Sequence, residues 1–228
     1  MPTTSPHILR TFDEALAALR GDVLMMASLT QRNLERALTG LFERDDDLCN
    51  VVIVDDEEVD TLEKQVDARG IDILSRFQPV ASDLRNVVTA MKLSTSLERV
   101  ADQAVNIARK AKKLNRLANM PEGALLKPLA ERAMALFTKS ISAYDSRDID
   151  LAGTIKPEDR ELDAEHHRVA ELLMERMEIG GKQTAALLNL VLIARHLERV
   201  GDHATNIAED VVFAEAAEDI RHAGAGGR

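Results

Sequence analysis

Apolar residues recur along the first forty positions of the chain with the period of an α-helix. The recurring residues are Leu16, Leu19, Val23, Met26, Leu34, Leu38 and Leu41. Steps of three, four and seven or eight residues place all of these side chains on one face of a helix. The pattern therefore predicts a long amphipathic helix that buries this face.

A second helix is predicted to begin after the acidic run 45–47 and to continue to about Phe77. Aspartate side chains can cap the first turn, and their charge suits the positive end of a helix. The segment 51–54 is β-branched and would favour a strand in isolation. A strand there would have no partner strand to pair with, so we interpret the segment as helix.

Pro79 ends the second helix, and Ser82 or Asp83 is a candidate N-cap for a third helix that runs to about Leu117. The segment 119–123 contains a proline and is interpreted as a linker. The pattern then repeats, with further helices expected at about 125–145, 148–177 and 183–213, and with a disordered tail at 223–228. The sequence thus predicts an all-α protein of six helices.

An internal duplication relates the two halves of the chain. Residues 97–108 align with residues 197–208 at an offset of 100, and nine of the twelve positions are identical. A weaker similarity relates 56–60 to 159–163. We therefore predict two tandem three-helix bundles, at 1–118 and 119–222, related by a pseudo-two-fold axis.

The duplicated segments carry pairs of acidic residues four positions apart. Such a pair projects from one face of a helix, about one turn apart. The four pairs are Asp56 with Asp60, Glu98 with Asp102, Asp159 with Asp163, and Glu198 with Asp202. Like charges at this spacing destabilise a helix by roughly 0.2–0.5 kcal/mol, so their repetition in both halves indicates a cation that offsets the repulsion.

Two kinds of cation could fill this role. Arg99 and Arg199 lie inside the duplicated segments, and hard oxygen ligands suit metal ions such as Mg, Mn and Fe. Asn106 and Asn206 extend the acidic line by one turn and could add amide oxygens. A solvated acidic face without metal is the alternative, and the sequence leaves open which pairs share one cluster.

Gly201 and the histidines bear on the same region. Glycine inside a helix costs about 1 kcal/mol relative to alanine, so Gly201 indicates a close approach by another group, although Ala101 occupies the equivalent position. The Glu-x-x-His pattern of di-iron bundles is absent from the duplicated segments. Surface positions are therefore expected for His166, His167, His196 and His203, and core positions for Met25, Met26, Met134, Met174 and Met177.

The amino-acid composition argues against several classes of function. Acidic residues outnumber basic ones by 39 to 29, which gives a net charge of −10, and aromatic residues make up 3%. These values argue against a phosphate-backbone footprint and against a stacking platform for nucleic acid. Cys49 is the single cysteine, and no phosphate loop or catalytic triad pattern is present, so we do not expect an enzyme. No leader or membrane-spanning stretch is recognised, and we expect a cytoplasmic protein.

Three motifs together resemble one known family. Segments 98–102 and 198–202 are similar to the duplicated ExxxD signatures of the PhoU family, and 78–85 looks like that family's other marker. With 219–222 near the end, the resemblance covers about residues 8 to 222. Two departures are visible: Ala101 replaces the commoner glycine, and 183–187 stands where a second Asp-Leu-Arg would be. The halves are thus not expected to be equivalent, and Asp83 and Arg85 are expected to mark one functional face.

The resemblance implies a fold, a site and partners. It implies two tandem three-helix bundles whose acidic surface binds multinuclear clusters of Fe, Mn, Mg or Zn. It further implies a homodimer that regulates phosphate homeostasis between the ATPase subunit of the phosphate ABC transporter and the phosphate-sensing histidine kinase, and reaches the membrane only through these partners. Such a protein restrains phosphate uptake and the phosphate-starvation response. The rival hypotheses are a metal-dependent hydrolase or oxidase and a helical scaffold without metal.

Overall fold

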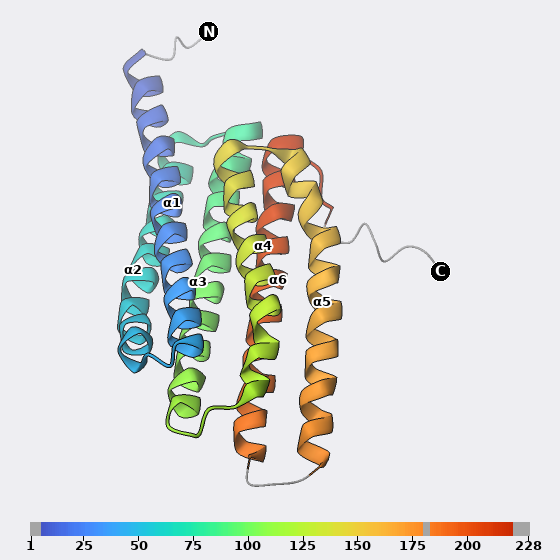
Figure 1. Ribbon diagram of the computed structural model, residues 1–228. Helices are drawn as coiled ribbons and strands as arrows, with labels where there is room; N and C mark the ends of the chain where they lie inside the picture. The colour runs from blue at the N-terminus through green and yellow to red at the C-terminus, as the bar shows by residue number, and fades with distance from the viewer. Residues whose placement is uncertain (1–5, 180–182, 221–228) are drawn as a thin grey trace.

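The computed structural model describes residues 6–179 and 183–220, and the tail expected at 223–228 lies outside this part of the chain. Within it the chain forms six α-helices and one short 3-10 helix (Figure 1). These elements are α1 (Pro6–Phe42), α2 (Asp46–Phe77), α3 (Ala81–Asn115), η1 (Pro121–Leu125), α4 (Leu126–Ser146), α5 (Ile149–Glu178) and α6 (Thr184–Ala216). The all-α prediction is confirmed, because these residues form no strand.

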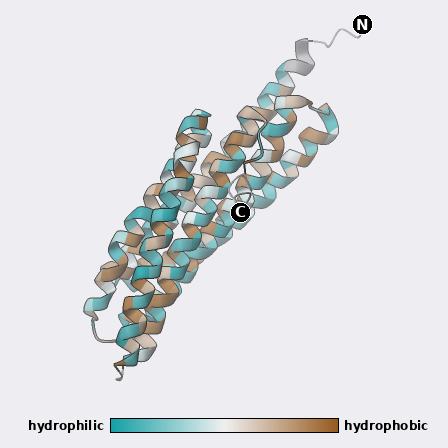
Figure 2. Ribbon diagram, turned by 90° about the vertical axis from the view of Figure 1, so that its right-hand side faces the viewer, coloured by the Kyte–Doolittle hydropathy of each residue, from teal (hydrophilic) through white to brown (hydrophobic). Residues whose placement is uncertain are grey.

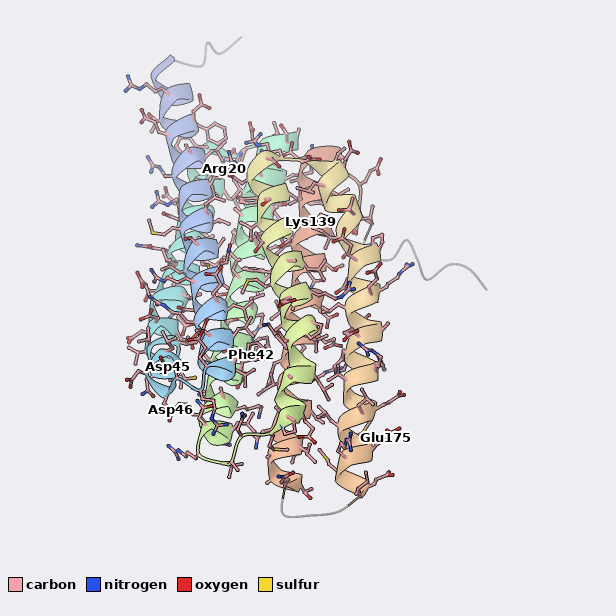
Figure 3. All side chains as sticks on the ribbon, in the orientation of Figure 1. Arg20, Phe42, Asp45, Asp46, Lys139 and Glu175 are labelled. Carbon is pink, nitrogen blue, oxygen red and sulfur yellow. The ribbon has the colours of Figure 1, made fainter. Side chains whose placement is uncertain are left out.

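The N-terminus of α2 is capped by Asp45, which belongs to the acidic run 45–47 from which the sequence predicted the cap. The Asp45 carboxylate accepts hydrogen bonds from the backbone N–H groups of Asp47 and Leu48, at 2.9 and 3.0 Å. Asp45 and Asp46 lie at the turn between α1 and α2 (Figure 3). The β-branched segment 51–54 continues as helix, with Val52 fully buried, because packing against the core outweighs its local β preference.

The start of α3 differs from the prediction. Val80, not Ser82 or Asp83, is the N-cap residue, and its side chain makes no capping hydrogen bond. The chain turns at Gln78, which ends α2 in the left-handed conformation with φ of 47°. Val80 then takes up the extended conformation that a cap requires, so Ser82 and Asp83 already lie in the first helical turn. The linker predicted at 119–123 is likewise partly helical, since η1 begins at Pro121.

The helices pack as two three-helix units joined side by side. Helices α1, α2 and α3 contact one another, as do α4, α5 and α6, and contacts between α3 and α6 and between α1 and α4 join the two units. Successive helices run in opposite directions, so α3 descends and α6 ascends in Figure 1. The duplicated segments therefore lie on the two central, antiparallel helices.

Three hydrogen-bonded pairs fix the register between α3 and α6. They join Arg85 Nε to the Ala214 carbonyl at 3.1 Å, Thr89 Oγ1 to the Asp210 carbonyl at 3.4 Å, and Gln103 Oε1 to His196 Nδ1 at 2.8 Å. From one pair to the next, the residue number rises along α3 by as much as it falls along α6, so the two helices are antiparallel and in constant register. This register sets segments 98–102 and 198–202 opposite each other, as a pseudo-two-fold arrangement of the repeats requires.

An apolar stripe on each central helix forms part of the core. Eight of its residues have no exposed surface: Leu97, Val100, Ala104, Ile107, Leu197, Val200, Ala204 and Ile207. Met26 is also fully buried, but the core positions predicted for Met25 and Met174 are wrong, because these side chains are 59% and 48% exposed. Both methionines are next to core positions in sequence and point to the other side of their helices.

Apolar and polar residues alternate along the helices (Figure 2). Among the described residues, no helix combines the length and the apolar character that a membrane span needs. Many of the apolar side chains are buried in the contacts between helices.

Truncation of equivalent core residues tests this packing. Ile107→Ala and Ile207→Ala each remove a fully buried side chain, and each is expected to lower the free energy of unfolding by about 2–5 kcal/mol. Met25→Ala is the control, and its effect should stay within about 0.5 kcal/mol because the side chain is exposed. Urea denaturation followed by circular dichroism measures all three. A loss below about 1 kcal/mol for either isoleucine would contradict the described core.

Candidate metal-binding faces

The first acidic face consists of Asp56 and Asp60 on α2 and Glu98 and Asp102 on α3. Packing of α2 against α3 brings the two pairs together. Burial raises the pKa of Asp56, and the charges of Asp60 and Asp102 raise it further. Burial also raises the pKa of Glu98, followed by the charge of Asp102. The two pairs thus share one electrostatic environment, which the sequence alone did not establish.

An arginine already lies across the first acidic face. Arg99 approaches Glu98 Oε2 at 3.3 Å through Nε and Asp102 Oδ2 at 3.6 Å through Nη1. Glu63 on α2, which the sequence analysis missed, lies beside this face. Burial raises the pKa of Glu63, as do the charges of Asp67 and Asp60. The signal was available in the sequence, since Glu63 lies one helical turn after Asp60.

The second acidic face consists of Asp159 and Asp163 on α5 and Glu198 and Asp202 on α6. Asp163, Glu198 and Asp202 each offer a carboxylate oxygen, and these three oxygens lie within 4.8 Å of one another. In the described part of the chain, no other three acidic, histidine or cysteine side chains meet this closely. Burial raises the pKa values of Glu198 and Asp202, and the neighbouring carboxylates add to the effect.

The arginine that pairs with the second acidic face is not the one expected. Arg195 Nη1 lies 3.1 Å from Glu198 Oε1, one turn before the position that Arg199 occupies in the motif. This ion pair does not include Asp163 or Asp202. The charges of Arg195 and Arg199 nevertheless act on both Glu198 and Asp202 and oppose the upward shift of their pKa values.

Asp159 is held against the backbone of α6. Its side chain is 9% exposed, and Thr205 Oγ1 donates a hydrogen bond to Asp159 Oδ2 at 3.0 Å. Burial raises the pKa of Asp159 to about 6, against the opposing effect of the Thr205 hydrogen bond. A Cβ atom on Gly201 would lie 2.5 Å from Asp159 Oδ1 and 2.3 Å from Leu162 Cδ2. The close approach that Gly201 indicated is therefore present.

Several buried carboxylate oxygens are available to bind a cation. Asp159 Oδ1, Glu198 Oε2 and Glu98 Oε2 are buried and have no hydrogen-bond partner, although Arg99 lies near the last of these. Buried acceptors are ordinarily paired, and carboxylate oxygens are the ligands that hard metal ions prefer. The residues of the second acidic face therefore fit a metal ion, whereas no three carboxylates of the first acidic face converge to 4.8 Å. The binding of metal by the eight carboxylates stays a prediction.

The histidines are less exposed than expected. His166 is only 9% exposed, so its predicted surface position is wrong. Burial lowers the pKa of His196 to about 4, and Nδ1 of this residue pairs with Gln103 across the two halves. His166 lies one turn after Asp163 on α5, which the spacing in the sequence could have revealed.

Substitution of Gly201 tests the close contact between α5 and α6. Gly201→Ala gains helix propensity but forces a clash with Leu162 and Asp159, so we expect a loss of about 1–3 kcal/mol in the free energy of unfolding. Gly153→Ala on α5 is the matched control, because nothing lies within 4 Å of its added Cβ. The control should stabilise the protein by up to about 1 kcal/mol. Equal effects of the two substitutions in urea denaturation would exclude the contact.

Asp159 also gives a pH-dependent prediction. The folded protein binds this proton more tightly than the unfolded chain, so Asp159 favours folding below the usual carboxyl pKa and loses this contribution as the pH rises through about 6. In the presence of a chelator, Asp159→Asn should therefore stabilise the protein by roughly 1 kcal/mol at pH 7.5 and by little at pH 4. Denaturation at both values measures the difference. A constant effect across this range would contradict it.

Comparison with known proteins shows which family the chain is similar to. The model of the PhoU domain matches the chain twice, at residues 23–111 and 126–211. Proteins named phosphate-specific transport system accessory protein PhoU, or homolog of it, are similar to this chain over most of its length. The one from Zymomonas mobilis is 34% identical and covers 91% of this chain and 88% of its own, and the one from Escherichia coli K12 is 31% identical and covers 96% and 90%.

Two solved structures have the same fold. The crystal structure of PhoU from Pseudomonas aeruginosa superposes with a TM-score of 0.88 at 29% identity and covers 91% of this chain and all of its own. The phosphate transport system regulatory protein PhoU from Streptococcus pneumoniae superposes with a TM-score of 0.83 at 23% identity, covering 91% and 98%. The two matched domains, the similar full-length relatives and the shared fold lead to one conclusion. The chain belongs to the PhoU domain family.

Proposed function

We propose that this protein is a cytoplasmic regulator of phosphate homeostasis. It connects the ATPase subunit of the phosphate ABC transporter with the phosphate-sensing histidine kinase, and it restrains phosphate uptake and the phosphate-starvation response when phosphate is ample. One observation carries the proposal: relatives named as accessory proteins of the phosphate-specific transport system match 91% and 96% of the chain.

The shape of the molecule is suited to an adaptor. Helices α1, α3 and α6 have 33 to 37 residues and extend for about 50 Å along the long axis of the molecule (Figure 1). Such a body offers long helical sides on which two partners, or a second copy of the chain, can be accommodated at once. The proposal includes a homodimer as the working form.

The two acidic faces would hold the metal ions of this regulator. Asp56, Asp60, Glu98 and Asp102 would bind in the first half, and Asp159, Asp163, Glu198 and Asp202 in the second. A bound cation would neutralise carboxylates that otherwise repel one another across α2 and α3 or across α5 and α6. The protein contributes the fixed spacing of these groups along paired helices, so the metal-bound surface would be more rigid than the free one.

The rival hypothesis is a hydrolase or oxidase that uses the carboxylate clusters. Metal-dependent catalysis needs a concave pocket with a general base beside the metal. A cavity of 260 Å³ lies among α1, α3, α4 and α6, and one of 370 Å³ lies near the α1–α2 turn and η1. Neither cavity is lined by any of the eight carboxylates. These two cavities therefore lie apart from the acidic faces, which favours the adaptor over the enzyme.

Affinity purification from cells grown with ample or limiting phosphate tests the proposal. We expect the wild-type chain to retain the transporter ATPase and the sensor kinase when phosphate is ample, and to carry metal detectable by mass spectrometry. The E98Q/D102N/E198Q/D202N variant should lose the metal and release the starvation response, because it removes four proposed ligands. Absence of both partners would overturn the proposal.

A control for charge removal comes from α5, which carries none of the four substituted residues. Glu171 and Glu175 on α5 are exposed and four residues apart, and Glu175 lies near the lower end of that helix (Figure 3). The E171Q/E175Q variant should keep both metal and partners. Metal-dependent turnover of a phosphoester by the wild-type protein, abolished in the E98Q/D102N/E198Q/D202N variant, would favour the enzyme.

A further inference from the structure

The C-terminal half of α6 supplies acidic partners to two lysines. Lys92 Nζ on α3 lies 3.0 Å from Asp210 Oδ1 and 5.1 Å from the centre of the Phe213 ring. Asp210 and Phe213 are three residues apart, so both project from one side of α6. Lys156 on α5 pairs with Glu209 at 2.8 Å. At this end of the molecule, each of these lysines therefore meets a carboxylate from within the chain.

The duplication places another lysine at the equivalent position in the other half, opposite a leucine. With the offset of 100 residues between the repeats, Lys92 and Asp210 correspond to Leu192 and Lys110. The antiparallel register of α3 and α6 also sets Lys110 opposite Leu192, because the residue number rises along α3 by as much as it falls along α6. Lys110 is close to α6, since its charge acts on the pKa of His196. A leucine thus stands where the first pair has its aspartate.

Lys110 and its neighbour Lys113 are not neutralised by acidic side chains. Neither lysine forms an ion pair within residues 6–179 and 183–220. Burial lowers the pKa of Lys110, and the charge of Lys113 lowers it further. Residues three positions apart lie on one side of a helix, so the two ammonium groups repel each other. An anionic group placed beside both would relieve this repulsion.

Three exposed apolar side chains adjoin these lysines. Leu188 and Leu192 are 51% and 37% exposed and lie one turn apart on α6. Met174 on α5 is 48% exposed and follows Asp163 by three helical turns, while Leu188 precedes Asp202 by four, so both lie on the side of the second acidic face. These residues belong to the lower ends of α3, α5 and α6 in Figure 1. We call the following five residues the lysine–leucine strip: Lys110, Lys113, Met174, Leu188 and Leu192.

The contact at the other end of α6 indicates which kind of group suits the strip. There, a helix presents an acidic residue and, three positions later, an aromatic residue to Lys92. A partner helix with this spacing would bring carboxylates to Lys110 and Lys113, and its apolar side chains would cover the two leucines. Helices that lay an apolar side on an exposed apolar surface are a common mode of recognition, and charge-assisted hydrogen bonds fix their orientation.

A flat anionic membrane fits this side of the molecule less well. The carboxylates of the second acidic face lie on the same side of α5 and α6 as Met174 and Leu188, and the chain has a net charge of −10. An anionic bilayer would approach these carboxylates together with the lysines and would be repelled by them. A single helix, about 10 Å wide, can contact the strip alone.

We propose that the lysine–leucine strip is a docking site for an acidic amphipathic helix of a partner protein. Acidic side chains three or four positions apart on that helix pair with Lys110 and Lys113. Its apolar side chains cover Met174, Leu188 and Leu192. This inference rests on the partner binding in the proposed function, and it specifies the surface and the chemistry of the partner segment. It requires no bound metal.

A peptide from the chain itself is the probe. The sequence of residues 206–216, stapled as a helix on the side away from Asp210 and Phe213, carries the groups that meet Lys92. Fluorescence anisotropy should detect its binding to the wild-type protein. The K110E/K113E and L188Q/L192Q variants should each weaken this binding by at least about tenfold. K64E/K127E is the matched control, because it reverses two exposed lysines outside the strip.

Charge exchange separates a direct contact from damage to the fold. A peptide with the substitutions E209K/D210K should bind the K110E/K113E protein at least about tenfold more tightly than the wild type. A misfolded variant would not recover binding in this way, and circular dichroism verifies the helical content. Equal binding of either peptide to the wild-type and K110E/K113E proteins would overturn the inference.

Two further measurements test other occupants of the strip. Vesicles of phosphatidylcholine and phosphatidylglycerol should not bind the protein through Lys110 and Lys113, and sedimentation should give the same oligomeric state for K110E/K113E as for the wild type. Vesicle binding that K110E/K113E abolishes would assign the strip to a membrane, and conversion of a dimer to a monomer would assign it to a second copy. Either result would overturn the inference.

Purification from cells separates this inference from the proposed function. With ample phosphate, the K110E/K113E protein should lose the transporter ATPase or the sensor kinase, and K64E/K127E should retain both. Retention of both partners by K110E/K113E would overturn the docking site and leave the proposed function intact. Absence of both partners from the wild-type protein would overturn the proposed function.

Discussion

The antiparallel contact between α3 and α6 is the constraint on which the rest of the structure depends. It is the main contact between the two three-helix units, and the pairs Arg85–Ala214, Thr89–Asp210 and Gln103–His196 fix its register. Both helices carry the duplicated segments, and on each of them the side that faces the core buries a leucine, Leu97 on α3 and Leu197 on α6. The helices α2 and α5 pack against other sides of α3 and α6, and each contributes one acidic pair to the face that forms there.

Burying apolar residues on one side of these helices has an electrostatic cost on the other. Glu98 and Glu198 each lie one position from a fully buried leucine, so their carboxylates are partly removed from water, and burial is the largest cause of their raised pKa values. Repulsion from the neighbouring acids adds to this cost. The protein offsets it differently in the two halves, with Arg99 spanning the first face and Arg195 touching only one acid of the second. The retention of all four acid pairs is difficult to explain by packing alone, which is the physical basis for proposing a cation.

Much of the fold could be predicted from the sequence because helical periodicity and capping are local. The Asp45 cap, the helical state of segment 51–54 and the buried apolar face of α1 that contains Val23 and Leu34 all agree with the structure. The errors arose where a neighbouring helix decides the outcome. Met25 was expected in the core and is exposed, because its side chain points away from the side of α1 on which Met26 is buried. His166 was expected on the surface and is buried, because α5 packs on α6.

The sequence by itself determined the duplication, the four acid pairs and the glycine at position 201, because spacing along one helix fixes which side chains share a face. Only the tertiary structure decided which pairs meet, since that depends on the register between α2 and α3 and between α5 and α6. It also decided that Asp159 on α5 rests on Gly201 on α6. These contacts join residues tens of positions apart, and no local pattern specifies the rotation and axial offset of one helix against another.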